Sequence, residues 1–153
     1  MRVLHNVSLI VLLTSGCSDS TDGSLSGREL YPGNPFGGRW YSSEQVASGS
    51  QIFETNCSEC HGANAEGRYA NWKQKLPDGS FPPPPLDGSA HAWHHPRSVL
   101  LEVIENGGLA LGGKMPAFGA VLNGEEKLAA IAYFQNFWDD ETYRQWEVMG
   151  GTR

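Results

Sequence analysis

The chain has 153 residues, with 11 Lys and Arg against 17 Asp and Glu, and a formal net charge of −6 at pH 7. This length allows one domain and a tail, without room for a second core. The acidic balance argues against nucleic acid as a partner, because contact with phosphates needs a basic surface. No internal repeat is visible in the sequence.

The chain begins with a segment typical of a secretory signal. Residues 1–16 contain one basic residue, Arg2, then an apolar run over residues 7–13 and small residues. The run is too short to span a membrane. Its end at Cys17 resembles a bacterial lipoprotein signal, in which the cysteine is lipidated and becomes the mature N-terminus, held at a membrane surface. The alternative is ordinary cleavage, which leaves Cys17 as a free thiol. Both interpretations predict a folded domain outside the cytoplasm, in the bacterial periplasm or on the outer face of the cell membrane.

Composition divides the rest of the chain into three parts. Residues 17–41 are rich in Ser, Gly, Asp, Thr and Pro, which predicts a flexible tether. The folded domain is expected over residues 42–140, and residues 141–153 are interpreted as a C-terminal extension.

The first predicted helix begins after Ser42. Gln45 lies three residues later, as in a capping box. The residues expected on its buried face are Val46, Gly49, Ile52 and Phe53. This helix leads directly into the most informative motif of the chain.

That motif is Cys57-Ser58-Glu59-Cys60-His61, the attachment pattern of a covalent c-type haem. Each thiol can add across one haem vinyl group, and His61 can present a ring nitrogen to the iron from the same side. A C-x-x-C pair also occurs in zinc sites and thiol–disulfide oxidoreductases. A structural zinc site usually needs four ligands, and the only other cysteine is Cys17, in the signal-like segment, which argues against zinc. A redox-active cysteine pair is expected next to a βαβ unit, and the sequence predicts no such unit. The sequence therefore favours one covalent haem c.

A long irregular segment, residues 67–93, follows the motif. Its proline run, residues 82–85, excludes helix and favours an extended polyproline path. Three histidines come next: His91, His94 and His95. A histidine can be an axial iron ligand or part of a copper site. For these three we favour other roles: capping the following helix, facing solvent, or bonding to a haem propionate. Trp93 and Arg97 are predicted neighbours of a haem propionate.

Two further helices are predicted after this segment. The first begins near Pro96 and ends at Gly107, and the second is capped by Asn123 and continues towards Trp138. Glu126 completes a capping box for the second. No segment alternates as a strand would, so the fold is predicted to be all-α.

The loop between these two helices offers a sixth ligand for the iron. Met115 lies in a glycine-rich stretch before Pro116, downstream of the haem motif. A thioether is a soft ligand that favours ferrous iron and raises the reduction potential. A lone methionine is more often a core residue, but this position favours ligation. Met149 is a poorer candidate, because it lies beyond the last predicted helix.

From about residue 43 to residue 138 the chain resembles a class I cytochrome c. The residues that carry the resemblance are His61-Gly62 with Gly67, Met115-Pro116-Ala117-Phe118, Gly49 with Phe53, and Ile131-Ala132-Tyr133-Phe134. It implies three to five helices around one covalent haem, with Gly49 at the crossing of the first and last helices. It also implies that the carbonyl of Pro84 bonds the second nitrogen of His61, which would fix the orientation of the ring. The long loop over residues 68–83 departs from compact members of the family.

The predicted function is single-electron transfer between envelope redox partners, with His61 and Met115 as axial ligands and no catalytic residue. Two alternatives remain. One is an open-site haem enzyme or gas sensor in which Met115 does not bind the iron, and the other is a haem subunit fixed in a larger oxidoreductase complex.

Overall fold

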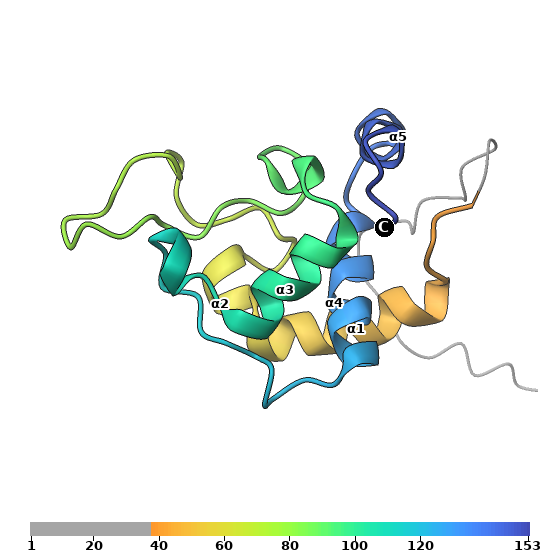
Figure 1. Cartoon of the computed structure of the whole chain (residues 1–153), viewed down its shortest axis with the longest axis horizontal. Helices are drawn as coiled ribbons and strands as arrows, with labels where there is room; N and C mark the ends of the chain where they lie inside the picture. Colours follow the sequence, from red (N-terminus) through yellow and green to blue (C-terminus); the bar gives the residue numbers. More distant parts are fainter. Residues whose placement is uncertain (1–37) are drawn as a thin grey trace, which may run out of the picture.

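The computed structural model describes residues 38–153, which form an all-helical domain (Figure 1). The helices, in chain order, are α1 (Ser43–Asn56), α2 (Ser58–His61), η1 (Ala92–His94), α3 (Arg97–Asn106), η2 (Leu109–Leu111), α4 (Gly124–Gln135) and α5 (Asp140–Val148). No strand occurs among these residues, so the predicted all-α class is confirmed. The predicted signal segment, Cys17 and most of the predicted tether lie outside the described residues. Within them, none of the helices combines the length and apolarity that a membrane crossing requires.

Local side-chain caps start the two longest helices where the sequence predicted them. The Gln45 backbone N–H donates to Ser42 Oγ at 3.3 Å, and the Ser42 N–H donates to Gln45 Oε1 at 3.0 Å. Asn123 and Glu126 form the same reciprocal pair at the start of α4. Each box satisfies backbone donors that the helix itself leaves unpaired.

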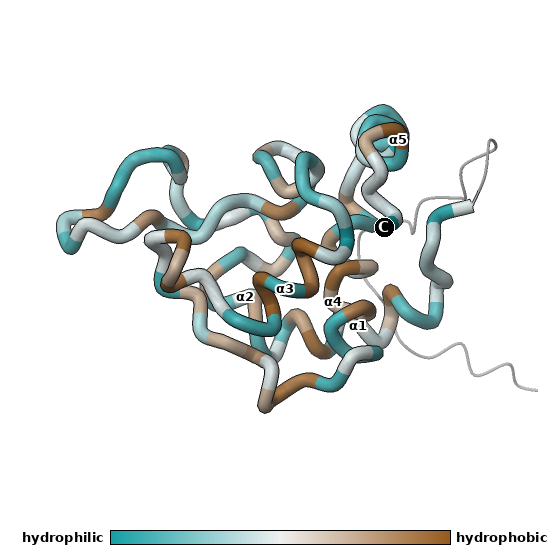
Figure 2. The backbone as a smooth tube through the Cα atoms, viewed as in Figure 1, coloured by the Kyte–Doolittle hydropathy of each residue, from teal (hydrophilic) through white to brown (hydrophobic). Residues whose placement is uncertain are grey.

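The helices α1 and α4 cross in close contact at Gly49. A Cβ atom on Gly49 would lie 2.0 Å from the carbonyl oxygen of Ala129, so only a residue without one allows this approach. Beside the crossing, the rings of Phe53 and Tyr133 lie 5.1 Å apart between centroids. Figure 2 shows hydrophobic residues concentrated on α3 and α4, whereas the long segment before η1 is mostly hydrophilic. The crossing therefore anchors the core, as the family resemblance implied.

A helix that the sequence analysis did not predict closes the core. α4 ends at Gln135, before the expected Trp138, and Asp139 then caps α5 by accepting from the Thr142 N–H at 2.7 Å. Tyr143 and Trp146 on α5 are fully buried, and the Trp146 ring meets that of Trp138 at 5.9 Å between centroids. α5 is polar apart from this one narrow face, which hid its packing role in the sequence.

The last residues of the chain contact the start of α3. The Arg97 N–H donates to the Gly151 carbonyl at 2.7 Å, and the Ser98 N–H donates to the Arg153 carbonyl at 3.1 Å. Pro96 occupies the N-cap of α3 without a side-chain acceptor. The backbone carbonyls of residues 151 and 153 therefore replace a side-chain cap.

Replacing Gly49 with Ala is expected to destabilise the holoprotein by about 1–3 kcal/mol, the usual cost of overpacking a tight contact. That loss exceeds the gain in helix propensity, about 1 kcal/mol. Gly124→Ala is the matched control, because a Cβ there meets no atom within 4 Å. Thermal unfolding measures both variants. An unchanged Tm for G49A would contradict the close crossing.

Candidate haem site

The two thiols and the imidazole of the motif lie on one helical turn. The Cys57 N–H donates to the Phe53 carbonyl at the end of α1, and the His61 N–H donates to the Cys57 carbonyl at 2.9 Å. Cys57 and Cys60 are both free thiols, one half-buried and the other exposed. The capped helix α1 therefore delivers both sulfurs and the His61 ring to one region.

The environment of the thiols does not suit the two alternative uses of C-x-x-C. Burial, with a smaller contribution from Cys60, raises the pKa of Cys57 to about 11. Thiol–disulfide oxidoreductases need a lowered thiol pKa instead. Over residues 38–153, no three His, Cys, Asp or Glu side chains gather in a way that could hold a metal ion such as zinc.

His61 is buried and uses one ring nitrogen for a backbone contact. His61 is only 8% exposed to solvent, and its Nδ1 lies 2.9 Å from the carbonyl oxygen of Pro84. Burial lowers the pKa of His61, and the Pro84 contact opposes this only in part. The ring is therefore held neutral, with Nδ1 as the donor and Nε2 left to bind a metal.

The turn that carries Pro84 is fixed to the haem motif by backbone hydrogen bonds. The Leu86 N–H donates to the Ala65 carbonyl at 2.7 Å, and the Gly67 N–H donates to the His61 carbonyl at 2.6 Å. Trp138 Nε1 donates to the Leu86 carbonyl at 2.7 Å. These contacts connect the acceptor of His61 to both the motif and the core.

Met115 is half-buried and lies against the C-terminal end of α3. The Gly108 N–H donates to the Met115 carbonyl at 2.9 Å. A Cβ atom on Gly107, whose φ is +78°, would lie 2.6 Å from that same oxygen. Glycine at position 107 thus serves both the end of α3 and the close approach of the methionine backbone.

The other predicted site residues have contacts of their own. Trp93 stacks on His94 at 3.7 Å between ring centroids. The Arg97 guanidinium donates to the Thr152 carbonyl at 2.8 Å and lies 4.6 Å from the centre of the Trp40 ring. These contacts direct Arg97 towards the end of the chain, and a propionate role for either residue stays a prediction.

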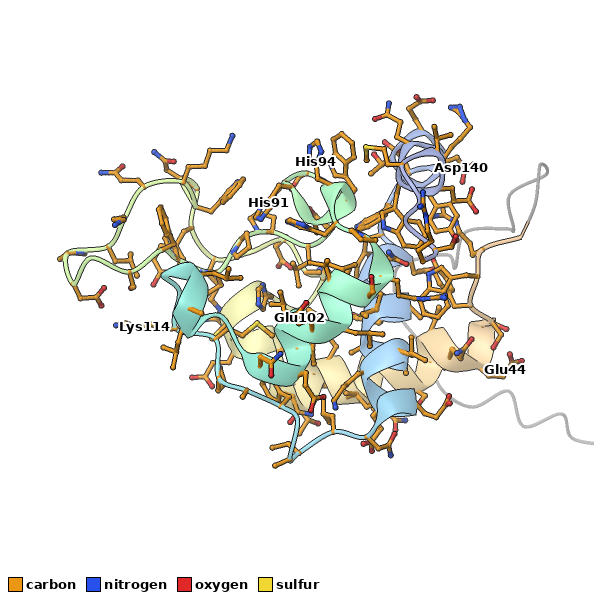
Figure 3. The ribbon with its side chains drawn as sticks, viewed as in Figure 1. Glu44, His91, His94, Glu102, Lys114 and Asp140 are labelled. Carbon is orange, nitrogen blue, oxygen red and sulfur yellow. The ribbon has the colours of Figure 1, made fainter. Side chains whose placement is uncertain are left out.

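His91, His94 and His95 lie in or directly beside η1 and belong to no group of side chains that could hold a metal ion among the described residues. Figure 3 labels His91 and His94. His91 stacks on Trp72 at 4.8 Å and meets His95 edge-on at 5.4 Å. Burial, followed by the positive charges of His95, His94 and Lys73, lowers the pKa of His91. Its Nδ1 is buried without a partner among the described residues.

Sequence reasoning missed the contacts of the methionine-bearing segment with the long loop. Phe81 donates its N–H to the Gly112 carbonyl at 2.9 Å, and Lys114 forms an ion pair with Asp78. No periodicity or motif links residues 36 positions apart, so the pair left no signal in the sequence.

The donor set matches a covalently attached haem. Two thiols on one turn can form two thioethers, His61 Nε2 can bind iron, and a thioether sulfur is available on Met115. Each of these groups is the residue type that the cofactor needs, and His61 is held in the neutral form that can bind a metal.

Replacing Gly67 with Ala is expected to loosen the Pro84 contact, because its Cβ would lie 3.1 Å from Pro85. The Nδ1 proton of His61 should then exchange with solvent about three- to tenfold faster, as expected for partial loss of a bond worth 0.5–1.5 kcal/mol. Gly79→Ala is the control, since that glycine also has positive φ but open space around it. Nitrogen-15 NMR of the ring measures both. Equal exchange rates would contradict the coupling.

A protein-family model matches the greater part of this chain. The family described as cytochrome C oxidase, cbb3-type, subunit III matches residues 44–134, from the first turn of α1 to the last turn of α4. No curated protein and no solved structure gives a match. The matched residues exceed half of the chain and contain the C-x-x-C-H motif, the Pro84 turn and Met115. The chain therefore belongs to this family of c-type cytochrome domains, which are electron-transfer haem domains.

Proposed function

We propose that this protein is a single-electron carrier that holds one haem c through Cys57 and Cys60, with His61 and Met115 as axial ligands. The observation that carries the proposal is the His61–Pro84 contact at 2.9 Å, beside two free thiols on the same helical turn. Bound haem supplies a one-electron couple between ferric and ferrous iron.

The residues on the histidine side have separate roles in this proposal. Cys57 and Cys60 hold the cofactor by two thioether bonds, formed when each S–H adds across a vinyl group. His61 donates its Nε2 lone pair to iron, and Pro84 keeps the ring in one tautomer and orientation. Burial of His61 excludes water from that side.

Met115 would supply a soft thioether, which favours the ferrous state and raises the potential. The Gly107–Gly108 turn holds the Met115 backbone against α3 and so limits where its sulfur can lie. A filled sixth position leaves no site for a substrate or gas, which separates this proposal from an open-site enzyme or sensor.

The second candidate is a haem subunit fixed in an oxidoreductase complex. The family description, which names an oxidase subunit, favours it. Co-purification in mild detergent separates the two: a free carrier elutes alone, whereas a subunit elutes with its complex. In either case the net charge of −6 favours partners with a basic contact surface.

We further propose that the protein works in the bacterial envelope, anchored through a lipid on Cys17. The support is the signal-like sequence of residues 1–16, and the fact that attachment to C-x-x-C-H takes place outside the cytoplasm. Cys17→Ser should move the holoprotein from the membrane fraction to the soluble fraction, because the variant has no site for acyl chains. Fractionation followed by haem staining measures this. A parent protein found in the soluble fraction would contradict the anchor.

Met115→Ala is expected to abolish the weak near-red sulfur-to-iron band of the oxidised protein, and to allow carbon monoxide to bind the reduced form. Met149→Ala is the control, because Met149 is 49% exposed at the end of α5 and should leave the band intact. Optical spectra of the oxidised and reduced proteins, with and without carbon monoxide, make the comparison. A high-spin parent that binds carbon monoxide rapidly would refute His/Met ligation.

A further inference from the structure

The long loop and the methionine loop meet at two points. We use the name strap for residues 68–83 and methionine loop for residues 107–118. Figure 1 shows the strap running out beside η2 and returning towards the core. The Lys114 side chain extends from the segment after η2 towards the strap (Figure 3), where it pairs with Asp78. The strap therefore contacts the methionine loop at Lys114, the residue directly before Met115.

The first contact is prepared by the strap's own turn. Asp78 Oδ1 accepts from the backbone N–H of Ser80 at 2.9 Å and from its hydroxyl at 2.6 Å. The Leu76 N–H donates to the Ser80 carbonyl at 2.8 Å and closes the turn. Asp78 Oδ2 is thereby directed to Lys114, whose ammonium group is the main reason that the pKa of Asp78 lies well below its usual range.

The second contact involves the backbone and ring of Phe81. Its N–H donates to the Gly112 carbonyl at 2.9 Å, and its ring would lie 3.4 Å from a Cβ on Gly112. Two prolines then lead to Pro84, the acceptor of His61. A polyproline segment is stiff. The strap therefore joins the methionine side of the site to the histidine side through a short, rigid connection.

The middle of the methionine loop has few other anchors. Between Gly108 and Lys114 the described backbone hydrogen bonds stay within the loop, apart from the Phe81–Gly112 bond. Leu109 and Leu111 are 73% and 67% exposed, so they add little packing. Contact with the strap is thus the main tertiary restraint on residues 109–114.

We infer that Asp78 and Phe81 are positioning residues that keep Met115 in place on the iron. This inference rests on the proposed His61/Met115 ligation. The strap favours the closed methionine loop, and a competing ligand must first open it. Loss of either contact raises the open population and strengthens the competitor by the same factor.

Imidazole binding to the oxidised holoprotein tests the inference, followed as loss of the near-red band. Asp78→Asn keeps the acceptor for Ser80 and removes only the ion pair. We expect imidazole to bind about two- to fivefold more tightly to D78N than to the parent, the range for an exposed ion pair. Phe81→Ala should act in the same direction. Added salt should tighten imidazole binding to the parent but not to D78N.

Asp87→Asn is the matched control. Asp87 accepts from the N–H and hydroxyl of Ser89 in the same kind of turn, and no ion pair to it occurs among the described residues. D87N changes the net charge equally and should leave imidazole affinity unchanged. In a Lys114→Gln background, D78N should also have no effect, because the pair is already broken.

Hydrogen exchange gives a second measurement on the same holoproteins. The Phe81 amide should exchange faster in D78N than in D87N, since its acceptor belongs to the methionine loop. If the parent shows the near-red band while D78N and D87N behave alike in either experiment, the strap inference fails and the proposed function stands. A parent without the band overturns the proposed ligation and the inference with it.

Discussion

The hydrogen bond between His61 Nδ1 and the Pro84 carbonyl is the contact on which the rest of the site depends. It holds a buried ring in one tautomer, so that the lone pair of Nε2 is available to a metal without a competing proton. The bond needs Pro84 in one place, which the Ala65–Leu86 and His61–Gly67 backbone bonds provide. Electron transfer favours such a rigid site, because ligands that do not move on oxidation and reduction keep the reorganisation small.

The core serves this site by holding α1 and α4 close together. Gly49 allows the two backbones to approach, and α1 then runs directly into α2 with its thiols. α5 adds Tyr143 and Trp146 to the buried cluster that contains Trp138, whose indole nitrogen donates to the Leu86 carbonyl in the turn after Pro84. The aromatic packing of the C-terminal segment and the orientation of the His61 ring are therefore parts of one connected structure.

Local features could be predicted from the sequence, and long-range ones could not. The starts of α1 and α4 could be predicted at Ser42 and Asn123, because a capping residue and its partner are only three residues apart in the sequence. Gly49 and Pro84 came from the family resemblance, since nothing in their immediate neighbours marks a helix crossing or a ring acceptor. α5 was not predicted, because its two buried aromatic residues lie on an otherwise polar helix. The Asp78–Lys114 ion pair was not predicted either, because it joins two irregular segments. The positions of Trp93 and Arg97 likewise depend on stacking partners that only the folded chain brings together.

The absence of a side-chain cap on α3 has a consequence for the order of folding. Its first amides bond to carbonyls of Gly151 and Arg153, and the Arg97 side chain bonds to a residue 55 positions downstream. A chain emerging in N-to-C order has the thiols of α2 in place long before these acceptors exist. Contacts between residues so far apart in the chain form slowly. We therefore expect the first turn of α3, the helix that leads to the methionine loop, to become complete only when the C-terminal residues fold back onto it, at a stage when Cys57 and Cys60 are already accessible.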